Sequence, residues 1–497
     1  LAVGAAGSAY CAGIAGSNNT IFGLNAGDAM NGGSAYNTAF GEDSLGGTMT
    51  GAADNNTAIG YKALFTVTSG DTNTCIGSNA GLILNTGSDN VIIGGAAGDA
   101  ITSTSNTVLI GKNAGGVINH DDAAGTVAIG SQSGAAITSG ASNTAIGYES
   151  ANALVGASHN VALGYQALKG QVSGNRIVAI GKGAMGLADG SGSNDSSDNI
   201  FIGYLSGGGA WADASSTKNV AIGSYALDDA LNGANNNIAI GYQTMTVNTV
   251  GHSNTGVGHT CLLDLTEGIQ NTAIGQNSMP NVTTGSHNTA LGDSACLVLT
   301  TGSYNIGVGR LANYDTLTTG SHNICMGYAS NPSASDSTHQ FAFGNSVTGN
   351  ADNSLVFGNS TLDSAIAFGA TSVTAPSDER MKEDIQDSTA GLDFINDLRP
   401  ITFKWRMEKD IPEELITHVP DSEKRFKNDK INHGFIAQEV KEVIDSHSEI
   451  KDGFDMWSED EKDGRQRVGP GSLIPMLTKA VQELSQQVED LKKKVGD

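Results

Sequence analysis

The sequence predicts a mainly β protein, in which a β-solenoid shaft of 17-residue repeats precedes a small α+β domain that ends in a coiled-coil helix. Three observations lead to this prediction. A short motif recurs along the first 376 residues, the glycine content drops sharply beyond residue 376, and the last segment carries apolar residues at heptad spacing.

The composition changes near residue 376. Residues 1–376 contain 60 of the 67 glycines but only 7 of the 26 lysines and arginines, and with 23 acidic residues their net charge is −16. Residues 377–497 contain the other 19 basic residues against 28 acidic ones, a net charge of −9. We therefore expect a repeat shaft over 1–340, contracted aromatic repeats and a linker over 341–376, and a separate domain over 377–497.

The repeat motif has the form Asn-Thr-Ala-Ile-Gly and is complete at residues 56–60, 143–147 and 271–275. Its final glycine recurs at a modal step of 17 residues, at positions 23, 41, 60, 77, 94, 111, 130, 147, 164, 181, 203, 223, 241, 258, 275, 292, 309, 327, 344, 358 and 369. Gly- and Asn-rich sequence forms helices poorly, whereas the alternation in Thr-x-Ile is typical of a half-buried strand. With one motif per coil at ~4.8 Å, twenty-one coils predict a shaft of roughly 100 Å.

In such a coil we expect Ile or Leu to point inward, with Gly and Asn at corners that need a positive φ. Aromatic residues make up only 5% of the chain, so a single stack of coils has little apolar area to bury. Association of three chains along the shaft supplies that area, although a monomeric solenoid can also bury its own core.

Composition also excludes several classes of function. A net charge of −25 argues against a nucleic-acid partner, and no run of 18 apolar residues predicts a membrane span. The five dispersed cysteines predict small buried side chains, and we expect no cofactor and no metal. The patch at residues 120–122 (His-Asp-Asp) is interpreted as an inserted turn. Trp211 is the aromatic expected to be exposed, where it stacks on a sugar or covers a coil end. The chain begins with Leu and shows no signal peptide, so we expect a fragment or a trimmed chain that lacks an upstream attachment region.

Beyond residue 376 the pattern predicts a helix over 391–398, strands over 401–407 and 430–436, a helix over 437–445, a polar hairpin or loop over 454–467, and a helix from 472. In the last helix, apolar residues are spaced 4-3-4-3-4, with Val at a and Leu at d, which predicts an intermolecular coiled coil over 472–495. The stripe consists of Leu477, Val481, Leu484, Val488, Leu491 and Val495.

The junction between the two regions holds Ser377 and, five residues later, Lys382. A serine hydroxyl becomes a nucleophile when a neighbour accepts its proton, and a lysine accepts a proton only if burial or nearby cations lower its pKa. Arg380 is a possible source of such a field. Five residues along a regular helix place two side chains about 140° apart, so Ser377 must lie on an extended lead-in or meet a lysine of another chain. The structural alternative is that Ser377 is a helix N-cap.

Four blocks of sequence after residue 376 resemble the intramolecular chaperone of phage tailspikes and tail fibres, the peptidase S74 or endosialidase-type family. The blocks are Ser377-Asp378-x-Arg380-x-Lys382-x-x-Ile385, Leu398-Arg399-Pro400-x-x-Phe403-x-Trp405, residues 434–440 (GFIAQEV) and residues 473–484 (LIPMLTKAVQEL). The resemblance implies a domain that trimerises, templates the folding of the preceding fibre and then cleaves itself off. It implies scission of the Pro376–Ser377 bond, with Ser377 as the nucleophile and Lys382 as the general base of a single-turnover serine peptidase. The shaft repeats resemble the head repeats of trimeric autotransporter adhesins.

We therefore expect a homotrimeric phage tail fibre or tailspike, exposed on the virion and made in the host cytoplasm, with no turnover enzyme in its shaft. Its expected partners are two further copies of itself, a glycan or protein receptor on the bacterial surface, and an upstream virion attachment protein. The alternatives are a polysaccharide depolymerase, which needs a facing pair of carboxylates, and a cellular adhesin-like S74 protein.

Overall fold

The structure is a computed structural model that describes residues 18–496, except 29, 31–32, 50–52, 188–195, 212–213, 230, 371–372, 374–376, 416, 452–454 and 461–463. The chain divides into two compact units, Leu1–Pro376 and Ser377–Asp497. Each unit is described by itself.

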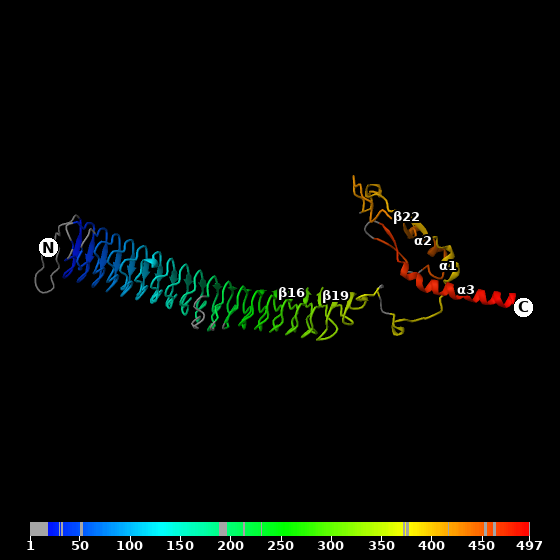
Figure 1. The fold of residues 1–497 in the computed structure, drawn as a ribbon, viewed down its shortest axis with the longest axis horizontal. Coiled ribbons are helices and arrows are strands. Elements are labelled where there is room, and N and C mark those ends of the chain that lie inside the picture. Colours follow the sequence, from blue (N-terminus) through cyan, green and yellow to red (C-terminus); the bar gives the residue numbers. More distant parts are fainter. Residues whose placement is uncertain are drawn as a thin grey trace. The chain divides into compact units, whose positions relative to one another are not determined.

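The first unit is a β-solenoid whose coils stack in sequence order (Figure 1), which confirms the predicted fold class. Each of the first eighteen strands has three residues, and each pairs in parallel with the strand one coil further on, as when Thr57, Ala58 and Ile59 align with Thr74, Cys75 and Ile76. These strands are β1 (Thr20–Phe22), β2 (Thr38–Phe40), β3 (Thr57–Ile59), β4 (Thr74–Ile76), β5 (Val91–Ile93), β6 (Val108–Ile110), β7 (Val127–Ile129), β8 (Thr144–Ile146), β9 (Val161–Leu163), β10 (Val178–Ile180), β11 (Ile200–Ile202), β12 (Val220–Ile222), β13 (Ile238–Ile240), β14 (Thr255–Val257), β15 (Thr272–Ile274), β16 (Thr289–Leu291), β17 (Ile306–Val308) and β18 (Ile324–Met326).

The prediction that the motif isoleucine points inward is wrong. In every short strand the middle residue is buried, usually an alanine such as Ala58 or Ala145, and its two neighbours face outward. Side chains alternate along a strand, so the Thr and Ile positions share the outer face. The interior of each coil is filled instead by the middle residue and by apolar residues of the following turn, such as Leu64 and Leu84.

Glycine and asparagine have separate roles in the coil. Gly147 has a φ of 136°, and a Cβ atom there would lie 2.3 Å from the carbonyl oxygen of Gly164 in the next coil, so only glycine fits. Asparagines outside the motif, such as Asn79 with a φ of 59°, occupy positive-φ corners as predicted. The motif asparagines have a different role: they are buried and form a ladder, in which Asn271 donates to the Gly285 carbonyl at 2.8 Å and accepts from the Asn288 backbone N–H at 2.9 Å.

The solenoid ends before the last predicted coil. Strands β19 (Gln340–Asn345) and β20 (Ser354–Asn359) are longer and still parallel, whereas β21 (Asp363–Ala367) pairs antiparallel with β20. The motif step before Gly369 is only 11 residues, too few for a full coil, and the chain reverses there. The backbone N–H of Asn359 donates to the Leu362 carbonyl at 2.9 Å in that turn. In the described part of the shaft, twenty parallel strands, not twenty-one, therefore form the stack.

Trp211 is buried, at 2% exposure, so the expectation of an exposed aromatic residue is wrong. Its ring packs edge-on against Phe201 at 5.5 Å, and its indole N–H donates to the Gly207 carbonyl at 3.1 Å. The longer chain between β11 and β12 folds this ring into the interior, beside the one short strand that has Phe as its buried residue.

The second unit contains three α-helices and two small antiparallel sheets (Figure 1). The helices are α1 (Leu392–Asp397), α2 (Ala437–Ser446) and α3 (Leu473–Val495), and the strands are β22 (Ile401–Phe403), which pairs with β23 (Asn432–Gly434), and β24 (Trp457–Glu459), which pairs with β25 (Gln466–Val468). Its core consists of Ala390, Phe394, Leu398, Val440, Ile444, Met456 and Leu473. This confirms a small α+β region that ends in a helix.

Candidate functional site

The structure brings Ser377 and Lys382 together. The ammonium Nζ of Lys382 donates to Ser377 Oγ at 2.7 Å. A single 3-10 turn, Glu379–Met381, separates the two residues, with extended backbone at Asp378 before it and at Lys382 after it. This is the extended lead-in required by the helical geometry argument, and it closes the pair within one chain.

Asp378 organises this turn. Its carboxylate accepts from the backbone N–H of Arg380 at 2.9 Å and forms an ion pair with the Arg380 guanidinium at 2.6 Å. The guanidinium and the backbone N–H together lower the pKa of the Asp378 carboxyl. The N-cap of the turn is therefore Asp378 rather than Ser377, and the positive charge of Arg380 is offset by its own carboxylate partner.

This arrangement places the two groups together but does not shield them from water. Both residues are exposed, and Lys382 Nζ donates the hydrogen bond to Ser377 Oγ. A general base must instead accept the hydroxyl proton as a neutral amine. Pro376, on the other side of the expected scissile bond, lies outside the described residues.

The heptad stripe of α3 is exposed in the single chain. Its six residues, from Leu477 to Val495, are 42 to 83% exposed. The helix packs on its own unit through a different face, on which Leu473 and Ala480 are buried and the Glu483 carboxylate accepts from the Leu392 backbone N–H at 2.8 Å. The stripe therefore has no partner among the described residues of this chain.

Three of the four motif blocks that suggested a family contribute to the core of the second unit. Arg399 and Glu439, which belong to different blocks, form an ion pair through two guanidinium nitrogens. Leu398, Val440 and Leu473 meet in one apolar cluster. The blocks are thus joined in space, although up to 75 residues separate them in sequence.

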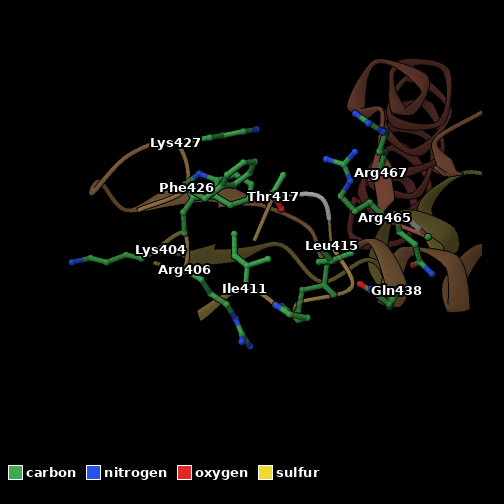
Figure 2. A pocket seen from close by; sticks show the side chains of 15 residues that line it. Lys404, Arg406, Ile411, Leu415, Thr417, Phe426, Lys427, Gln438, Arg465 and Arg467 are labelled. Atoms are coloured by element: carbon green, nitrogen blue, oxygen red, sulfur yellow. The ribbon is translucent and has the colours of Figure 1, made fainter. Parts of the chain in front are cut away.

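A basic cleft of about 680 Å³ lies in the second unit and was not predicted from the sequence. Five cationic residues line it, with no acidic residue among the described residues of the lining, and Figure 2 shows Arg465 and Arg467 on one side of it with Phe426 and Lys427 on the other. The lining comprises Lys404, Trp405, Arg406, Ile411, Pro412, Leu415, Thr417, Phe426, Lys427, Ile436, Gln438, Gly464, Arg465, Gln466 and Arg467. These residues come from five segments, only two of which overlap the motif blocks, so no sequence signal marked them as one site.

The shaft offers no comparable chemical centre in its described part. Residues 120–122 form a 3-10 turn region in which the backbone N–H of Asp122 donates to His120 Nδ1 at 3.2 Å. No group of three potential metal ligands gathers anywhere among the residues that the structure describes. Within the same part of the chain, no helix combines the length and the apolar character required to cross a bilayer.

Comparison with known proteins gives one match. No curated protein and no solved structure matches the chain. Residues 377–448, which are 72 of the 497, match the family model Peptidase_S74, described as the chaperone of endosialidase, a family that implies a self-cleaving peptidase. The chain thus combines a β-solenoid of 17-residue repeats with a segment, beginning at Ser377, that is similar to the peptidase S74 family.

Proposed function

We propose that this protein is a homotrimeric tail fibre or tailspike of a phage, whose second unit aligns three shafts and then cleaves the chain before Ser377. The observation that carries the proposal is the 2.7 Å contact between Lys382 Nζ and Ser377 Oγ at the first residues of the family match. In this proposal the shaft binds the host cell surface, and the fibre is exposed on the virion.

The proposed cleavage balances with water as the only co-reactant. A neutral Lys382 amine accepts the hydroxyl proton of Ser377, and Ser377 Oγ attacks the carbonyl carbon of Pro376. The bond from that carbon to the Ser377 nitrogen breaks, and the nitrogen receives the proton from Lys382. The resulting ester is hydrolysed, which leaves a carboxylate on Pro376 and a free amino group on Ser377. One chain makes one cut, so the reaction is single-turnover.

Two exposed apolar surfaces support self-association. Outward-facing strand residues form a row along the solenoid, and many of them are 36 to 52% exposed, among them Phe22, Phe40, Leu163, Ile222, Ile240, Ile274, Leu291 and Met326. The stripe on α3 is the second surface. Contiguous apolar surface of this extent is typical of an interface. The number three comes from the family resemblance, because Val at a with Leu at d does not by itself select three strands.

The test is denaturing gel electrophoresis of the wild-type chain and of Ser377→Ala. We expect the wild type to yield pieces of 376 and 121 residues, with Ser377 as the new N-terminus by sequencing. Ser377→Ala and Lys382→Met remain at full length and still form trimers by light scattering. A wild-type chain that stays intact after assembly removes the peptidase from the proposal.

The chaperone role has its own test. Residues 1–376 expressed alone are expected to aggregate or remain unassembled, because the shaft lacks its aligning unit. Soluble trimers from that chain argue against the chaperone role, whether or not cleavage occurs.

A further inference from the structure

We infer that the basic cleft of one copy binds the junction segment, residues 377–389, of a second copy, and that this docking switches on the cleavage. The inference rests on the proposed function and adds the surface that couples assembly to the reaction. It is argued from charge, exposure and the geometry of the Ser377–Lys382 pair.

The junction segment is an exposed stretch of chain that does not pack into the core of its own unit. Residues 377–389 are exposed along their whole length, and the chain enters the core of its unit only at Ala390, which is buried. The segment includes two large apolar side chains, Met381 and Ile385, that are 66% and 63% exposed. No residue of the segment lines the cleft of its own chain.

The charges of the two surfaces are complementary. The junction segment has five acidic residues against two basic ones, whereas the described lining of the cleft has five basic residues and no acidic one. Arg465 and Arg467 both pair with Asp460, but among the described residues Lys404 and Lys427 have no carboxylate partner. The chain as a whole has a net charge of −25, so a cleft lined by cations differs in charge from the rest of the molecule and attracts an acidic segment.

The apolar side chains of the cleft also match those of the junction segment. The Lys427 ammonium lies 4.6 Å from the centre of the Trp405 ring, and Phe426 packs edge-on against the same ring at 5.4 Å. With Ile411 and Leu415 these rings give the cleft an apolar floor beneath its cations. An extended peptide with acidic residues around Met381 and Ile385 fits such a surface, whereas a small inorganic anion leaves the floor uncovered.

Docking in a neighbouring copy supplies what the isolated pair lacks. In the single chain, Lys382 is exposed and its Nζ donates to Ser377 Oγ, whereas the proposed reaction needs a neutral amine that accepts the hydroxyl proton. Cations of the neighbouring cleft disfavour a further positive charge, and loss of water around the segment acts in the same direction, so both favour the neutral amine. A ring of three copies, each cleft holding the next copy's segment, is a closed heterologous arrangement. The peptide bond is then cut only after assembly.

The first experiment exchanges the charges. The cleft variant is Lys404→Glu with Lys427→Glu, the segment variant is Glu383→Lys with Asp387→Lys, and the control is Lys451→Glu with Lys493→Glu, both at exposed positions away from the cleft. We expect each of the first two to slow cleavage at least about tenfold and their combination to restore it to within about threefold of the wild type. The control cleaves at the wild-type rate. A combined variant as slow as its parents overturns the inference.

The second experiment separates the two copies. One copy keeps Ser377 but carries the cleft variant, and the other carries Ser377→Ala with an intact cleft. Each stays uncut when expressed alone. When the two are co-expressed, the first copy is cut, because a neighbour supplies its cleft. If the first copy remains intact in mixed trimers, the cleft acts within its own chain or not at all, and the inference fails.

The third experiment reads docking without cleavage. Copies with Ser377→Ala carry either Ile385→Cys or Thr417→Cys, and the mixture is treated with diamide. We expect a disulfide-linked dimer on non-reducing gels only when both copies are present, and less of it at 1 M salt. If the wild-type chain never cuts but the two cysteine variants give this dimer, the docking is retained and the peptidase is lost. If the wild-type chain cuts but the two cysteine variants give no dimer, the peptidase is retained and the docking is lost.

Discussion

The solenoid and the C-terminal unit differ in how far apart in the sequence their hydrogen-bonded residues lie. In the solenoid nearly every hydrogen bond between coils joins residues about 17 apart, as when the Asn271 backbone N–H donates to Asn254 Oδ1 at 2.9 Å. In the second unit the Glu483 carboxylate accepts from a backbone N–H 91 residues earlier. The first kind of contact repeats in each coil, whereas the second occurs once.

This difference bears on how the chain finds its register. A solenoid that slips by one coil exchanges one asparagine of the ladder for the next and keeps most of its hydrogen bonds. In the proposed trimer, three such shafts laid side by side have many nearly equivalent alignments. A unit with unique long-range contacts has one native arrangement, so its association would fix the alignment of the shafts attached to it. That asymmetry is the physical reason for a folding aid at the end of a repeat array.

The largest expected effect comes from breaking the unit with unique contacts. Phe394 is fully buried in its core, and Phe394→Ala is expected to lower its free energy of unfolding by about 3–5 kcal/mol. Urea unfolding followed by fluorescence of Trp405 and Trp457 measures this, with the exposed Val419→Ala as the control. We also expect Phe394→Ala to leave the shaft unassembled. A normal trimer of this variant would mean that the shafts align themselves.

The next effect tests the repeat. Gly147→Ala forces a side chain into a φ of 136° and against the Gly164 carbonyl, at a cost of about 2–4 kcal/mol. Gly95→Ala is the matched control, since a Cβ atom there meets nothing within 4 Å. Thermal unfolding by circular dichroism, with limited proteolysis to locate the break, compares the two. Equal melting temperatures would contradict the role given to the motif glycine.

The sequence predicts the solenoid well because its signal is repeated about twenty times, and one motif error does not change the period. It misleads about the direction of Ile59 and its equivalents, because alternation defines two faces of a strand without saying which one is inside. Only the coiled backbone decides this, because it turns the middle residue of each strand, such as Ala58, to the inside. Trp211 was misplaced for a related reason, since an insertion usually leaves the core and this one fills it.

The junction was predictable for a different reason. The separation of Ser377 and Lys382 by five residues excludes a regular helix and leaves an extended lead-in or a lysine of another chain. The structure has the extended lead-in, together with a 3-10 turn that the sequence did not predict. The basic cleft was not predictable, because Lys404, Phe426 and Arg465 belong to segments that only the tertiary fold brings together.

A smaller effect on stability should distinguish the buried asparagine ladder from an exposed asparagine of the same coil. Asn271→Ala leaves the Gly285 carbonyl and the Asn288 N–H without their buried partners, at a cost of about 1–3 kcal/mol. Asn281→Ala in the same coil removes an exposed hydrogen bond to the Leu297 carbonyl and should cost far less. Parallel melting curves provide the comparison. If both variants melt alike, the ladder contributes no more than a surface contact.

The smallest effect concerns pH and should be confined to the second unit. The Asp397 and Glu449 carboxylates raise the pKa of His447, because its Nε2 and Nδ1 lie 2.9 and 3.0 Å from them. A raised folded pKa means that this contribution is complete below the unfolded value of about 6.5 and is lost as the pH rises through the folded value. Between about pH 6 and 8 the free energy of unfolding of the unit should fall by less than about 1 kcal/mol, because Asp397 is well exposed.

Urea unfolding at several pH values measures this pH dependence, and His447→Gln should flatten the profile in that window. A wild-type profile that is already flat, or one that rises with pH, contradicts the assignment. Trp211 fluorescence, which reports the shaft, should not follow the change, because this ion pair has no counterpart in the coils around it.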